Sequence, residues 1–237
     1  MQPRRAANPR RAALGYMTRR LAALALALAA SGSPAAASAG SSADDDATRF
    51  FRAIQLDDDR AVRTVLARGL DPNIADPERG ETGLIQAMRY DAMKVAQLLL
   101  AHPGLRIDHA APNGNTALMM AAFQKNKPAV LALLEKGAQI NRPGWTALHY
   151  AAAAGDLDIM KLLLERHAYI DAESPTGMTP LMLAAREGME DAVKLLLQEG
   201  ADATLKDRAW GIDAAEFATR AQKPWITEAI QRHLGKK

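Results

Sequence analysis

Apolar residues recur along this chain at a spacing that predicts a series of short helices. Offsets of three and four residues lie on one face of an α-helix, so each such group predicts a helix with a buried face. Five segments share this pattern: Val62, Val65, Leu66; Val95, Leu98, Leu99; Val130, Leu133, Leu134; Ile159, Leu162, Leu163; and Val193, Leu196, Leu197. Gly69, Gly137 and Gly200 follow three of these helices, where a left-handed residue ends a helix, and His167 holds the same place in the fourth.

The five segments belong to a repeat. Equivalent places recur at steps of 34, 34, 30, 33 and 33 residues, and are occupied by Thr48, Thr82, Thr116, Thr146, Thr179 and Ile212. A period of this size is typical of stacked helix pairs that cannot bury their apolar faces alone. Threonine at a helix start accepts a hydrogen bond from a free amide, so each threonine predicts a further helix. Turn-forming residues at 71–77 and 171–177 predict a projecting hairpin between successive pairs.

Two units carry the repeated motif most completely. They read Trp145-Thr-Ala-Leu-His-Tyr-Ala-Ala-Ala-Ala-Gly155 and Met178-Thr-Pro-Leu-Met-Leu-Ala-Ala-Arg-Glu-Gly188. Pro180 stands at the first helical position, where a missing amide donor does no harm. These segments resemble the ankyrin repeat, whose signature is Thr-Pro-Leu-His-x-Ala-Ala, and the resemblance covers residues 48 to about 234. It implies an all-α solenoid of stacked helix-turn-helix units with projecting β-hairpin fingers.

The spacing and the resemblance together divide the chain into units. Residues 48–81 are expected to form an amino-terminal cap, because Phe50-Phe51 replaces the usual Leu-His and charged residues surround it. Four repeats follow, at 82–115, 116–145, 146–178 and 179–211, and residues 212–237, without the threonine, are expected to form a carboxy-terminal cap. Residues 40–47 are small and acidic and predict a flexible lead-in. The short step of 30 predicts that the finger at 141–145 lacks three residues.

Residues 1–39 predict an export signal. Arginine pairs precede the apolar run 21–30, and Ala37-Ser38-Ala39 offers small residues for cleavage, so the mature chain is expected to begin at Gly40. Met17, shortly before Arg19-Arg20, would be an alternative start. The residues after this pair favour the general secretory route over the twin-arginine route, and hence a periplasmic protein of a bacterium without a stable membrane anchor after cleavage. A signal anchor left uncut is the alternative. The absence of cysteine excludes a lipid-anchored lipoprotein and any disulfide.

The net charge of +3 belongs to this leader and does not indicate a nucleic-acid partner. Six of the 30 Lys and Arg residues precede residue 40, which leaves 24 against 27 acidic residues in the remainder. A balance of about −3 gives no field that would gather a polyanion.

Candidate catalytic and metal-binding residues do not form a constellation. Five histidines are scattered over different units at no ligand spacing, so neither a metal site nor another cofactor is expected. His149 occupies the histidine place of the motif, where its imidazole can bond back toward the helix start, and it has no nucleophile beside it. The acidic runs Asp57-Asp58-Asp59 and Glu190-Asp191 fit helix starts better than paired catalytic carboxylates. The prediction is a protein without enzymatic activity.

The resemblance implies that a partner protein lies in the concave groove formed by the finger tips and the exposed ends of the first helices. Carried onto this chain, that face consists of Arg79, Glu81, Arg89, Tyr90, Asn113, Asn115, Phe123, Gln124, Arg142, Trp145, Thr176, Met178, Arg186 and Glu187, with Arg208 and Arg220 at the cap. Aromatic residues mixed with arginines are typical of interface hot spots. The sequence therefore favours a monomeric module that binds an exported protein, with a structural spacer or an inhibitor or immunity-type protein of one periplasmic enzyme as alternatives.

Trp145 allows two interpretations. It borders the shortened finger near the middle of the row, which predicts an anchor for the partner. Alternatively, the side chain folds back over apolar residues that the short finger leaves bare.

Overall fold

We analysed a computed structural model that describes residues 41–235. The predicted export signal, its cleavage site and the alternative start at Met17 lie outside the described residues.

The described residues form six pairs of α-helices that follow one another along the chain. The first helices of the pairs are α2 (Ser41–Gln55), α4 (Gly83–Arg89), α6 (Ala117–Phe123), α8 (Ala147–Ala154), α10 (Pro180–Glu187) and α12 (Ala214–Arg220). Their partners are α3 (Asp59–Ala67), α5 (Met93–Leu100), α7 (Lys127–Glu135), α9 (Leu157–Glu165), α11 (Glu190–Gln198) and α13 (Pro224–Leu234). Within residues 41–235 the fingers contain no regular strand, only one β-bridge between Ala75 and Thr82. The predicted all-α repeat solenoid is confirmed.

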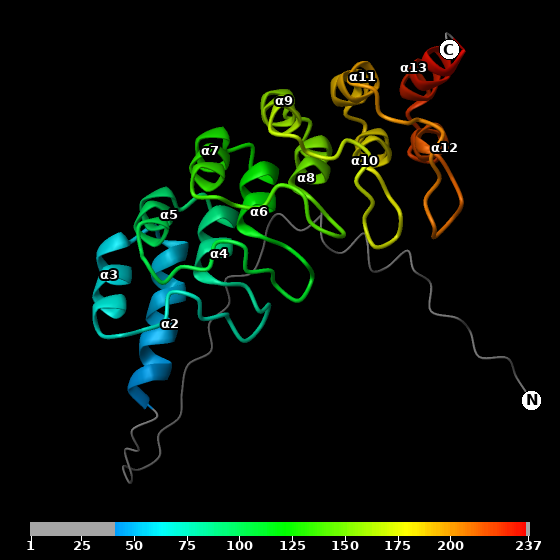
Figure 1. Ribbon diagram of the computed structural model, residues 1–237. Helices are drawn as coiled ribbons and strands as arrows, with labels where there is room; N and C mark the ends of the chain where they lie inside the picture. Colours follow the sequence, from blue (N-terminus) through cyan, green and yellow to red (C-terminus); the bar gives the residue numbers. More distant parts are fainter. Residues whose placement is uncertain (1–40, 236–237) are drawn as a thin grey trace, which may run out of the picture. The chain divides into compact units, whose positions relative to one another are not determined.

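The pairs stack so that each contacts those beside it. The first helices form one row and the second helices another, and the fingers project from the first row (Figure 1). Small residues make this close stacking possible, because Ala121, Ala122, Ala151, Ala152 and Ala184 are fully buried between neighbouring first helices. The apolar residues that predicted the second helices are buried or packed against the core, which runs continuously from Phe50 to Ile230.

Helix α2 begins earlier than the sequence predicted. Residues 41–47 were expected to be a flexible lead-in, but they form the first two turns of α2. Asp44 lies in the first turn, where a carboxylate is favoured by the helix dipole. Asp46 accepts a hydrogen bond from the Arg68 guanidinium at 2.9 Å, which ties this extension to the end of α3. The acidic character that suggested a solvated linker therefore stabilises a helix start.

Four of the predicted threonines stand at the starts of first helices: Thr82, Thr116, Thr146 and Thr179. The prediction is wrong for Thr48, which lies within α2, and it needs a correction at the carboxy-terminal cap. The side-chain oxygens of Thr116 and Thr179 accept hydrogen bonds from the amides of Met119 and Met182. In the last pair this role belongs to Asp213, which accepts from the Glu216 amide at 2.9 Å, and not to Ile212. The last step of the repeat, from Thr179 to Asp213, is therefore 34 residues. The finger before α12 also has a glycine two residues before the cap, because Gly211 has a positive φ as Gly177 does.

The finger at 141–145 is the short one. Three equivalent side chains at the finger bases accept a main-chain amide of the next unit: Asp108 from Gln139, Asn141 from Tyr169 and Asp171 from Asp202. Eight residues separate Asp108 from Thr116 and Asp171 from Thr179, but only five separate Asn141 from Thr146. The structure thus confirms that the three missing residues come out of the finger and that the helices keep their lengths.

Candidate binding surface

The predicted partner-binding residues fall into three groups by exposure. The exposed ones are Arg79, Tyr90, Asn113, Phe123, Gln124, Thr176, Arg208 and Arg220. The half-buried ones are Arg89, Arg142, Trp145, Arg186 and Glu187. The buried ones are Glu81, Asn115 and Met178.

The three buried residues share one position, directly before the residue that caps the next first helix. In each finger the carbonyl of this residue accepts the amide of an earlier finger residue, with distances of 2.9 Å for Asp76 to Glu81, Ala111 to Asn115 and Ser174 to Met178. This bond turns the side chain inward. These three side chains are therefore turned away from the surface of the free chain, and their contact with a partner stays a prediction.

Trp145 occupies the same position but remains only half-buried. Within the described finger 141–145, no main-chain hydrogen bond closes the turn in the way it does in the other fingers. The shortened finger therefore leaves this side chain at the surface. Arg142 of the same finger folds back, and its guanidinium donates to the carbonyl of Asp108 at 2.7 Å.

Trp145 belongs to a cluster of aromatic rings from two adjacent units. Its ring centroid lies 6.4 Å from that of Tyr150, which in turn lies 6.0 Å from Phe123, and both contacts are edge-to-face. The Tyr150 hydroxyl donates to the side-chain oxygen of Asn115 at 2.6 Å, which fixes the middle ring. Phe123 is 38% exposed. We call Phe123, Trp145 and Tyr150 the aromatic cluster.

Sequence reasoning missed Tyr150. The residue stands at the variable place of the motif, after Thr146-Ala-Leu-His, where neighbouring units carry Met120 and Leu183. Its aromatic side chain was the available signal, because among the four full repeats at 82–211 this place is aromatic in 146–178 and is Gln86, Met120 and Leu183 in the others.

Charged residues on the same side of the stack are largely paired with one another. Glu81 is buried and accepts two hydrogen bonds from the Arg89 guanidinium, one of them at 3.0 Å from Nε. Arg186 pairs with the neighbouring Glu187 at 2.8 Å. In each pair the guanidinium neutralises the carboxylate beside it. Both arginines are half-buried, so part of each side chain packs in the stack and part remains at the surface.

His149 is a structural histidine. Its Nε2 lies 2.8 Å from the carbonyl of Met178, which can only accept, so Nε2 carries the proton. Nδ1 is then the acceptor for the Thr146 amide at 3.2 Å and lies 2.9 Å from the Thr146 hydroxyl. Burial lowers the pKa of His149 to about 4, against the opposing effect of the bonded carbonyls, so the ring is neutral. The prediction that it bonds back toward the helix start is confirmed.

Between residues 41 and 235, no three His, Cys, Asp or Glu side chains are gathered so that they could hold a metal ion. No helix in this part of the chain has the length and apolar character needed to cross a membrane.

Comparison with known proteins gives a family and several relatives. Residues 50–143 and 141–207 match the family described as ankyrin repeats (3 copies). The chain is 37% identical over 145 residues to human SH3 and multiple ankyrin repeat domains protein 2, and 30% identical over 205 residues to the Caenorhabditis elegans protein glp-1. These matches cover 60% and 80% of this chain but only 8% and 15% of the relatives' lengths. The family match, which spans most of the helix pairs, shows that the chain belongs to the ankyrin-repeat family.

Proposed function

We propose that this chain is a non-catalytic module that binds an exported partner protein through the side of the stack that carries the finger tips and the exposed ends of the first helices. Ankyrin repeats generally mediate protein–protein interaction, which supports the coarser part of the proposal. The finer part is that the partner is an exported protein. The arginine pairs, the apolar run and the small residues before Gly40, which predict an export signal, support it.

The observation that carries the proposal is the aromatic cluster. Three rings from adjacent units meet at the surface near the middle of the finger row, where the short finger leaves Trp145 uncovered. Large aromatic side chains at the centre of a contact face lose water favourably on binding and concentrate interface energy. In typical interfaces a polar rim surrounds such an apolar centre. In this chain, Arg142 and the Arg186–Glu187 pair are half-buried charged groups of the predicted face that would belong to such a rim.

The test is Trp145→Ala in an assay with the partner captured from the periplasm by the mature chain. Loss of the anchor should weaken binding by about 2 kcal/mol or more, a factor of roughly 30 in Kd. Trp225→Ala is the matched control, because it removes a 46% exposed indole on α13 that is not among the predicted partner-binding residues, and it should change binding little. Trp145→Ala that lowers the melting temperature strongly but binds normally when folded would assign the residue to packing alone.

The location has its own test. Amino-terminal analysis of the exported protein should find a chain that begins at Gly40, because cleavage is expected after Ala39. A full-length chain in the cytosol would contradict the export proposal and leave the binding surface unaffected.

A further inference from the structure

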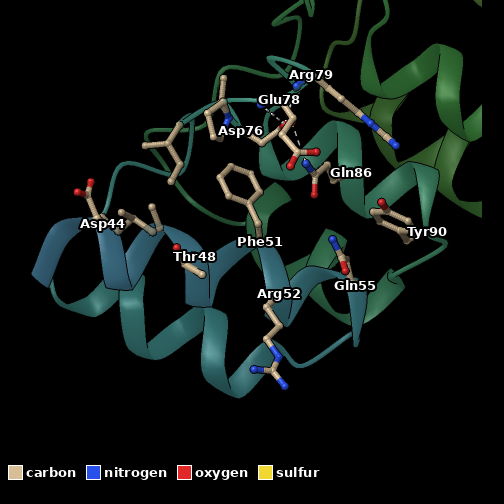
Figure 2. Close-up of a pocket in the computed structure, with 15 residues that line it drawn as sticks. Asp44, Thr48, Phe51, Arg52, Gln55, Asp76, Glu78, Arg79, Gln86 and Tyr90 are labelled. Atoms are coloured by element: carbon tan, nitrogen blue, oxygen red, sulfur yellow. Dashed lines mark hydrogen bonds between the residues drawn. The ribbon is translucent and has the colours of Figure 1, made fainter. Parts of the chain in front are cut away.

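A hollow lies at the amino-terminal end of the stack, and its lining includes none of the aromatic cluster. It has a volume of about 910 Å³ and is enclosed by α2, the first finger and α4. The extra turns of α2 form one wall through Asp44, Ala47 and Thr48, and Gln86 and Tyr90 of the next unit form another. Figure 2 shows Phe51 projecting from α2 between these walls, toward the side where Asp76 and Gln86 are hydrogen-bonded.

Asp76 fixes the orientation of the Gln86 amide. One Asp76 oxygen accepts the amides of Glu78 and Arg79, and the other accepts the Glu81 amide and Gln86 Nε2, the last at 2.9 Å. Burial would raise the pKa of Asp76, but these hydrogen bonds outweigh it and hold the pKa below the usual range, so the group is an ionised acceptor. A carboxylate cannot donate, and the Gln86 nitrogen must therefore face it.

This orientation leaves Gln86 Oε1 without a partner. Gln86 is only 6% exposed, and its side-chain carbonyl oxygen has no hydrogen-bond donor among the described residues. A buried acceptor without a donor is costly, and native proteins keep few of them. Because the amide cannot flip without losing Asp76, the oxygen keeps an unused acceptor capacity, although neighbouring side chains cover it in the free chain.

The lining of the hollow indicates what kind of donor suits it. Phe51, Leu70 and Ile74 give it an apolar floor. Its rim carries two cationic and two anionic side chains: Arg52, Arg79, Asp44 and Glu78. None of these four forms an ion pair within the described residues. Asp76, the third carboxylate of the lining, is already bonded to four donors. The four rim charges cancel, so the complementary group is an uncharged N–H next to an apolar side chain.

We propose that this hollow, the cap pocket, binds an uncharged extended peptide segment of the partner protein, with an apolar side chain against Phe51 and a main-chain N–H donated to Gln86 Oε1. In the free chain the oxygen is covered, so one of the lining rings, Phe51 or the exposed Tyr90, turns aside on binding. The proposal rests on the proposed protein-binding function for the source of the peptide, but not for the chemistry of the pocket.

Two probes that differ in their N–H groups test this chemistry on the full chain. N-acetylphenylalanine methylamide has two amide donors, and its analogue methylated at both nitrogens has none. The first should bind about tenfold more tightly, the factor expected for one net hydrogen bond, and should shift the NMR signals of the Gln86 amide and the Phe51 ring. Equal binding of both probes, shifts confined to the aromatic cluster, or no binding up to about 50 mM would overturn the proposal.

The methylated probe lacks the N–H donors but is also bulkier by two methyl groups. The variant Gln86→Met shows which of these two differences weakens its binding. This variant removes the acceptor while keeping the side-chain length, so the two probes should bind it equally. Gln97→Met is the matched control, the same amide-to-thioether change at an exposed position of α5 outside the pocket lining, and it should preserve the tenfold preference. A preference that survives in folded Gln86→Met would overturn the proposal, and if that variant does not fold, the unaltered chain with both probes decides. No partner is used, so a negative result leaves the proposed function of the groove standing.

Discussion

Single residues at the finger bases decide whether a side chain belongs to the core or to the surface. The residue before each first-helix cap is buried as Glu81, Asn115, Met178 and Ile212, and it is half-exposed only as Trp145. One main-chain hydrogen bond across the finger makes this difference. The family resemblance placed four of these residues, Glu81, Asn115, Trp145 and Met178, on the partner face, because it assigns a position to the finger without regard to the direction of the side chain.

His149 couples the stability of the stack to pH. Its pKa is lowered by burial to about 4, from an ordinary value of 6.5, so the unfolded chain binds a proton in a pH range where the folded chain does not. The stabilisation is fully present above pH 6.5 and is lost as the pH falls toward 4. We expect a loss of up to about 3 kcal/mol in this window, with no further contribution from His149 below it.

Urea unfolding between pH 4 and pH 8 measures this effect. His149→Gln cannot titrate, so the difference in unfolding free energy between the natural chain and the variant should shrink as the pH falls through the window. Asp71 and Asp76, whose pKa values are lowered, lose their contributions only at more acidic pH and do so in both proteins. A constant difference from pH 7 to pH 4 would show that the buried imidazole does not resist protonation.

The Arg89–Glu81 pair is expected to be the most costly ion pair to break. Glu81 is 1% exposed and Arg89 24%, so Arg89→Met leaves a buried carboxylate without its cation. We expect this substitution to lower the free energy of unfolding by about 3–5 kcal/mol. Chemical denaturation measures it. Arg220→Met, which breaks an exposed pair with Glu216, should cost less than about 1 kcal/mol.

The double variant Glu81→Gln with Arg89→Met separates charge from packing. Removing the buried charge together with its partner should restore a large part of the lost stability. If the double variant is as unstable as Arg89→Met, the guanidinium acts through its packing and not through the carboxylate.

At the scale of the element, the helices and fingers differ in how far the sequence predicts them. Helix pairs, their order and the shortened finger follow from the spacing of apolar residues and threonines, because each unit repeats the same local geometry. The start of α2 does not, since residues 41–47 have no preceding finger and are held by Asp46 and Arg68 instead. Asp213 was overlooked for a related reason: a count from threonine to threonine does not register an aspartate that caps equally well.

The candidate sites were less predictable than the fold. The positions of Phe123 and Trp145 could be inferred from the motif, but Tyr150 joins them only through contact across two units. The cap pocket depends on a hydrogen bond between Asp76 and Gln86, ten residues apart, which no periodic pattern encodes.

Lengthening the short finger should bury Trp145. The variant replaces Pro143 by Ser-Pro-Thr and inserts one residue between Asn141 and Arg142, which adds three residues in all. It restores the eight-residue interval of the neighbouring finger at 171–179. The closing main-chain hydrogen bond could then form and turn residue 145 inward. In a background with Trp210→Phe and Trp225→Phe, the fluorescence of Trp145 should shift to shorter wavelength and become less accessible to acrylamide. Unchanged quenching in a folded variant would show that finger length does not control its exposure.

At the scale of the whole repeat stack, stability is shared between neighbours. First helices pack on first helices and second helices on second helices, so an internal unit is covered on both sides and a terminal one on one side only. The carboxy-terminal pair covers the last full unit by packing α12 on α10 and α13 on α11. Phe217, Ile226 and Ile230 are the large side chains that it buries there.

Removal of residues 211–237 should therefore expose the apolar sides of α10 and α11 to water. No second core exists within the described residues to compensate, since the buried side chains form one continuous cluster. We expect the truncated chain to bind a hydrophobic dye and to aggregate, as measured by dye fluorescence and by light scattering after size exclusion. Trp225→Ala is the matched control, because this ring is 46% exposed on α13 beside Lys223 and its loss leaves the cap in place. That variant should remain monomeric and folded. A truncated chain that stays soluble, monomeric and fully helical would mean that α10 and α11 tolerate an open end, and that α12 and α13 serve another purpose than capping.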